Sequence, residues 1–152
     1  FPYTTLFRSE FNLNDEIIKL PYRINFREAN KKQVLSLTRK QQIILNCLFT
    51  RHYDGFIRQK NLESITAEVD EFVIPFVIQL LGEYVVEILL VARQQINSST
   101  MPGYKKFITD NGIFFQRTES RMISYWNEYY RWQYPKRKEY IGQMIFDDLK
   151  YS

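Results

Sequence analysis

The sequence has few of the residues on which common catalytic and metal sites depend. Its 152 residues include one cysteine, Cys47, and one histidine, His52. One cysteine cannot form an internal disulfide, and together with one histidine it cannot supply the usual four ligands of a zinc site. On a helix the two side chains would point about 140° apart, so they would not face each other as a nucleophile and its base must. The lack of cysteine pairs favours a reducing, cytoplasmic setting.

Glycine and proline are also scarce, with five of each. The glycines stand singly, so the sequence holds neither a Walker loop nor a dinucleotide-binding fingerprint. We therefore expect no catalytic residue, no cofactor and no metal. With 16% aromatic and 45% hydrophobic residues, the composition favours helices around a substantial core over a sheet-rich fold. The prediction is one mainly all-α domain, either a compact multi-helix bundle or a short helical-repeat-like array.

The first nine residues read as foreign to the protein. Residues 1–9 match the in-frame translation of a common sequencing-library adapter at all nine codons. Foreign segments are excluded from fold reasoning. We therefore interpret residues 1–9 as an adapter artefact and residues 10–152 as a single helical domain. Whether native residues preceded Glu10 stays open, and with it any upstream targeting segment.

Residues 72–91 form the most hydrophobic segment, and its length is close to that of a membrane span. Gln79, Glu83 and Glu87 interrupt it, and a carboxylate placed in hydrocarbon costs about 2.5–3.5 kcal/mol even on a lenient scale. These polar residues recur every four positions, which places them on one stripe of a helix. We predict a central hydrophobic helix over about residues 72–95, no transmembrane segment, and a buried polar seam of Gln79, Glu83 and Glu87.

Two helices are predicted before this segment. Thr38 and Gln41 have the spacing of a capping box, so a helix should run from there to about residue 53. Asp54 and the glycine after it indicate a turn, and a second helix over residues 56–67 would pack back on the first as an antiparallel pair.

The remaining segments give weaker signals. Residues 10–37 are ambiguous: the sequence is compatible with a short helix capped at Asn14-Asp15 and running through Leu20, and residues 22–26 alternate like a strand. The C-terminal half predicts a linker over residues 97–103. Three helices are predicted after it, over residues 104–109, 114–132 and 140–149.

Glu83 and Glu87 have the spacing of a carboxylate pair on one helix face. On a nearly buried helix such a pair can hold a metal ion or tune one carboxylate as an acid. Di-iron bundles combine such glutamates with Glu-x-x-His motifs, which the sequence lacks. Internal ion pairs are favoured, and the candidate partners are Arg51, Arg58, Arg121 and Arg131.

The segment from Tyr125 to Lys138 is rich in aromatic and basic residues. Helical spacing assigns Trp126, Tyr129 and Tyr130 to the core. Exposed rings beside cations are typical of protein interfaces and of single-stranded nucleic-acid sites, where bases stack on rings and cations meet phosphates. The residues left to bind a partner are Tyr125, Trp132, Tyr134, Lys136, Arg137 and Lys138.

Residues 54–91 resemble a helical-repeat unit of the HEAT type. An Asp-Gly turn precedes a helix with Arg58 and Leu62, and a second apolar helix opens near Pro75. The resemblance covers about a quarter of the chain, and it implies a scaffold whose exposed helix faces bind another macromolecule.

These observations predict a non-enzymatic helical interaction domain, or scaffold, that binds another protein. Nucleic-acid binding through the same C-terminal residues is one alternative. A small enzyme or ligand-binding protein built around Glu83 and Glu87 is another. The sequence does not specify the oligomeric state.

Overall fold

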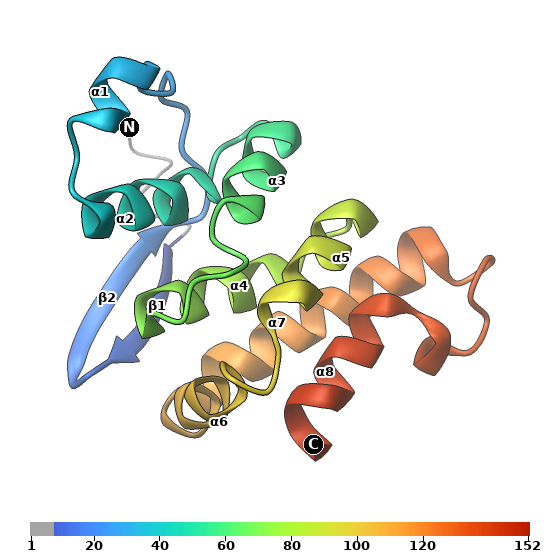
Figure 1. Cartoon of the computed structure of the whole chain (residues 1–152). Helices are drawn as coiled ribbons and strands as arrows, with labels where there is room; N and C mark the ends of the chain where they lie inside the picture. The colour runs from blue at the N-terminus through green and yellow to red at the C-terminus, as the bar shows by residue number, and fades with distance from the viewer. Residues whose placement is uncertain (1–7) are drawn as a thin grey trace.

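The computed structural model describes residues 8–152, and within them the chain is mainly α-helical (Figure 1). An antiparallel hairpin of β1 (Arg8–Leu13) and β2 (Glu16–Pro21) precedes the helices. The prediction of a mainly all-α domain is confirmed, in the form of a compact helical bundle. The helical elements are α1 (Lys31–Leu35), α2 (Arg39–Phe49), α3 (Gly55–Glu63), η1 (Glu71–Val73), α4 (Ile74–Leu81), α5 (Val86–Gln95), α6 (Met101–Asp110), α7 (Gly112–Tyr125), the π-helix η2 (Trp126–Tyr130), η3 (Arg137–Glu139) and α8 (Ile141–Tyr151).

The hairpin replaces both alternatives for the N-terminal segment. Asn14 and Asp15 form its turn with φ angles of 52° and 67°, in the left-handed region that these side chains tolerate better than most. The helix predicted at Asn14-Asp15 is therefore wrong, because both residues reverse the chain. The strand predicted over residues 22–26 is reduced to an isolated bridge between Ile24 and His52. Of the segment interpreted as an adapter, residues 1–7 lie outside the described residues, and the other two begin β1.

Side-chain caps fix the starts of the first three helices. Asn30 begins α1 with a capping box, and Thr38 and Gln41 form the predicted box at α2. Each box satisfies two backbone N–H groups that a helix start leaves unpaired. Asp54 caps α3 by accepting the Phe56 N–H at 2.8 Å. The predicted pair of helices is confirmed, since α3 packs against α2, although both helices end about four residues earlier than expected.

Residues 72–95 do not form the single continuous helix that the sequence predicts, so this prediction is wrong. It forms η1, α4 and α5, with a break at residues 82–85. Gly82 ends α4, and a Cβ at this position would lie 3.1 Å from Nε of Arg121, so glycine allows α4 and α7 to approach closely. Pro75 lies in the first turn of α4, where its missing N–H leaves no hydrogen bond unmade. Every residue of α4 is buried, so the predicted central position of this segment is correct for α4.

The other helices pack around α4. Contacts with α5, α6 and α7 cover it, and α8 packs against all three of these helices (Figure 1). The long helix predicted over residues 114–132 is present as α7 and η2, which follow each other without a break as far as Tyr130. The predicted C-terminal helix is present as α8.

Asn111 attaches the hairpin to the corner between α6 and α7. Its Oδ1 accepts the backbone N–H of Asn12 at 2.6 Å, and its Nδ2 donates to the Asn12 carbonyl at 2.8 Å and to the Phe107 carbonyl at 3.0 Å. Phe11 of β1 packs edge-on against Phe107 and Phe114. The hairpin is thus held on the helical bundle by hydrogen bonds and by the core.

Candidate functional site

Glu83 lies in the loop between α4 and α5, where three arginines surround it. Its carboxylate is 2.8 Å from Nη2 of Arg58, 3.0 Å from Nη2 of Arg23 and 3.7 Å from Nη2 of Arg51. The side chains of Glu83, Arg51 and Arg58 are at most 4% exposed, and that of Arg23 is 26% exposed. Arg51 and Arg58, two of the four arginines expected to pair with Glu83, therefore do so. Arg23 is an additional one, contributed by the segment after β2.

This cluster carries more positive than negative charge. Arg23, Arg51 and Arg121 lie over the Tyr22 ring, at 5.0, 5.9 and 5.4 Å from its centroid, as in cation–π pairs. Burial lowers the pKa of Arg51 from 12.5 to about 9, although the nearby Glu83 carboxylate acts to raise it. Nη2 of Arg51 donates to the Tyr22 carbonyl at 3.0 Å. The single carboxylate is therefore essential to a group of cations that would otherwise be buried uncompensated.

Glu83 and Glu87 do not form the expected carboxylate pair. The break after α4 leaves Glu83 ahead of α5 and Glu87 in the first turn of α5, so they do not share one helix face. Glu87 is exposed, and its charge suits the positive end of the helix dipole. Of the residues of the predicted polar seam, Gln79 and Glu83 are buried, whereas Glu87 is exposed. Within residues 8–152, no three His, Cys, Asp or Glu side chains are placed to hold a metal ion.

Cys47 and His52 are both engaged in the structure of the core. Cys47 is buried, as expected, and burial raises the pKa of its thiol to about 12. Nδ1 of His52 accepts the Asp54 N–H at 3.0 Å, so its Nε2 donates to the Phe26 carbonyl at 3.1 Å.

A group of aromatic side chains lies at the surface beside η2. Tyr84, Tyr125 and Tyr129 are in mutual contact, with ring centroids 5.5–6.1 Å apart. Tyr84 is 48% exposed, Tyr129 51% and Trp132 80%. The Trp132 indole N–H donates to the Tyr129 carbonyl at 3.0 Å, which joins it to the group. We refer to Tyr84, Tyr125, Tyr129 and Trp132 as the aromatic surface.

Only Tyr125 and Trp132 of the six predicted partner-binding residues belong to the aromatic surface. Tyr134 packs against Tyr140 instead. Tyr129, which was expected in the core, is exposed, because a π-helical turn holds more residues than an α-helical turn and so rotates the side chains that follow. The three predicted cations are exposed in the turn after η2 and in η3; they are Lys136, Arg137 and Lys138.

Trp126 anchors the backbone below the aromatic surface. It is buried, as expected, and its indole N–H donates to the Tyr134 carbonyl at 2.9 Å. The guanidinium groups of Arg131 and Arg137 lie 5.9 and 5.8 Å from its ring centroid. These contacts tie η2 to the turn that follows it, so the exposed rings stand on a well-packed base.

The sequence matches no known family model, and no similar curated protein or solved structure was found. The resemblance of residues 54–91 to a HEAT unit therefore rests only on the residues that suggested it. In this bundle α3 packs against α2 and α5. Within residues 8–152, no helix combines the length and the apolar composition that crossing a membrane requires.

Proposed function

We propose that this chain is a non-enzymatic helical interaction domain that binds another protein through the aromatic surface. The observation that carries the proposal is the contiguous group of Tyr84, Tyr125, Tyr129 and Trp132 at the surface. Tyr and Trp are the side chains most enriched at the energetic centres of protein interfaces, because each buries a large area and loses few rotamers.

The aromatic surface is held in place before any partner arrives. The Tyr130 hydroxyl donates to the Tyr84 carbonyl, which fixes the α4–α5 loop against η2. Trp132 is fixed by its hydrogen bond to the Tyr129 carbonyl. A preordered surface loses less entropy on binding, so more of the gain from burying the rings remains as affinity.

The cations next to this surface suggest the chemistry of the partner. Four cations are exposed after η2: Arg131, Lys136, Arg137 and Lys138. Cations at the rim of an interface steer and orient an acidic partner more than they strengthen the complex. The partner we infer is therefore a protein segment with apolar side chains flanked by carboxylates.

Affinity capture with the full chain as bait tests this proposal. The test variant is Tyr129→Ala combined with Trp132→Ala, and circular dichroism checks that its helices are intact. The matched control is Tyr53→Ala combined with Phe56→Ala, which removes two exposed rings from the α2–α3 turn and the start of α3. Two interface rings should together contribute at least about 2 kcal/mol, so the test variant should bind the captured protein at least about 30-fold more weakly.

The control should bind the captured protein as the wild type does. Equal capture by the test variant would exclude the aromatic surface as the binding site. If nuclease treatment and moderate salt instead remove the captured material, nucleic acid is the partner, since phosphate contacts weaken steeply with salt.

A further inference from the structure

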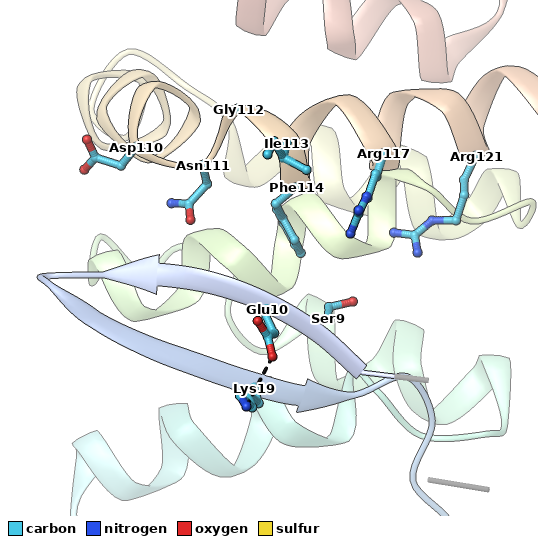
Figure 2. Close-up of a pocket in the computed structure, with 10 residues that line it drawn as sticks. All are labelled: Ser9, Glu10, Lys19, Asp110, Asn111, Gly112, Ile113, Phe114, Arg117 and Arg121. Atoms are coloured by element: carbon cyan, nitrogen blue, oxygen red, sulfur yellow. Dashed lines mark ion pairs between the residues drawn. The ribbon is translucent and has the colours of Figure 1, made fainter. Parts of the chain in front are cut away.

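A polar cleft separates the N-terminal hairpin from α7 (Figure 2). Its volume is about 930 Å³, which lies within the range of small-molecule sites. Glu10 and Lys19 form the wall on the hairpin, and the corner between α6 and α7 continues into Arg117 and Arg121 on the other side. Figure 2 shows both arginine side chains directed from α7 toward the hairpin.

The arginines of this cleft form no ion pair within residues 8–152. Its two carboxylates, Glu10 and Asp110, already pair with lysines, at 3.3 and 3.5 Å. Arg117 and Arg121 are four residues apart on α7, so they point to the same side, and neither forms an ion pair with another residue of the described chain. The low-dielectric walls of a cleft concentrate the field of such unpaired charges.

Arg121 is held in an ordered position. Its guanidinium lies 5.4 Å from the centroid of the Tyr22 ring, and its Nη2 donates to Oγ1 of Thr118 at 3.4 Å. Its Nε is buried without a hydrogen-bond partner among residues 8–152. A guanidinium that is already ordered binds an oxyanion at a lower entropic cost.

The start of α7 adds to the positive potential. Asn111 occupies the N-cap position, but its side chain is hydrogen-bonded to Asn12, so no side chain caps α7. No acidic residue lies in the first turn. Gly112 and Ile113 of this turn line the cleft, where uncapped N–H groups and the helix dipole attract anions.

We propose that the cleft binds the phosphate group of a small phosphorylated molecule through Arg117 and Arg121. Two guanidinium forks match a tetrahedral, doubly charged oxyanion in number and geometry, whereas one carboxylate satisfies a single fork. The volume of the cleft exceeds what inorganic phosphate alone would fill, so it leaves room for a further group on the ligand.

Isothermal titration calorimetry on the full chain tests this site, with inorganic phosphate, adenosine monophosphate and acetate as probes at constant ionic strength. Both phosphates should bind, and acetate should not. Arg117→Ala should weaken phosphate binding by about tenfold or more, because it removes a charge-assisted contact from an exposed position that the fold does not use. The matched control is Arg27→Ala, which removes the same charge from an exposed position outside the cleft and should bind phosphate as the wild type does.

A second variant keeps the test independent of folding. Arg121→Lys retains the charge but loses the planar fork, so it should also weaken phosphate binding while circular dichroism stays unchanged. Tighter binding of adenosine monophosphate than of phosphate identifies a phosphorylated molecule as the ligand, and equal binding identifies free phosphate. Acetate binding as tight as phosphate binding, or unchanged binding by Arg117→Ala, would overturn the proposal. Arg117 lies outside the aromatic surface, so the phosphate-binding experiment and the partner-binding experiment test the two proposals independently.

Discussion

Replacing Glu83 with glutamine is expected to destabilise the fold by about 3–5 kcal/mol. The change preserves the size of the side chain and removes the charge that Arg23, Arg51 and Arg58 share. Buried guanidinium groups without a counter-ion have lost their hydration and gained nothing in exchange. The cluster joins four separate segments of the chain, so the loss should appear in global unfolding.

The magnitude follows from burial. Arg58 and Glu83 are 2.8 Å apart and each is 4% exposed, so solvent screens this pair very little. Arg23 is partly exposed, and its pair adds only a small amount because water competes for it. In a chain of this size about 1 kcal/mol shifts Tm by roughly 2–4 °C, so Tm should fall by about 6–20 °C.

Urea unfolding, followed by tryptophan fluorescence and far-ultraviolet circular dichroism, measures the effect. Glu87→Gln is the matched control, since it makes the same change at an exposed position and should alter stability by less than about 0.5 kcal/mol. Equal losses at Glu83 and Glu87 would refute the reasoning.

Three further changes test local features. Gly142→Ala should destabilise the fold by about 1–3 kcal/mol, because the added Cβ would lie 2.7 Å from Cγ of Met122. A Cβ at Gly112 would meet nothing within 4 Å, so Gly112→Ala should be neutral or stabilising by up to about 1 kcal/mol. Similar melting curves for the two variants would contradict this packing. Thr38→Ala should lower stability in urea by about 1 kcal/mol by removing the cap of α2, and no change would show that the cap is dispensable. Cys47 should resist iodoacetamide at neutral pH and react fully after denaturation, because burial raises the pKa of its thiol to about 12; rapid labelling of the native protein would contradict its burial.

Elements with short-range signals could be predicted from the sequence. The box at Thr38 and Gln41 sets the start of α2 because both of its hydrogen bonds span three residues. The turn at Asn14-Asp15 could not be assigned in this way, since residues that cap helices also tolerate the left-handed conformation of a hairpin turn. The pairing of β1 with β2 decides between the two, and the sequence shows it only as weak alternation on either side of the turn.

The break after α4 has a different cause. Polar residues every four positions are compatible with one long helix, and this local pattern favoured the wrong prediction. The arginines that surround Glu83 come from distant segments, so their ion pairs are tertiary contacts that no local pattern contains. Arg51 and Arg58 could be proposed as partners by residue type, whereas Arg23 lies in a segment whose structure was itself open.

The sequence predicted exposed aromatic side chains in the segment from Tyr125 to Lys138, but only two of the four residues of the aromatic surface, Tyr125 and Trp132. The density of rings between Tyr125 and Tyr134 pointed to the segment that supplies three of the four members of the aromatic surface. The assignment of Tyr129 to the core assumed α-helical spacing, which the π-helix changes. Tyr84 joins the surface from the α4–α5 loop, and its place there depends on how that loop docks against η2.

The hydrogen bonds between Asn111 and Asn12 join residues that are 99 positions apart. During translation the hairpin therefore leaves the ribosome long before the helix corner that receives it. Until that corner has emerged, the hairpin lacks these hydrogen bonds and the ring contacts of Phe11, and a two-stranded ribbon on its own is marginally stable in water. The hairpin should accordingly be secured on the bundle only after α6 and the start of α7 have been synthesised.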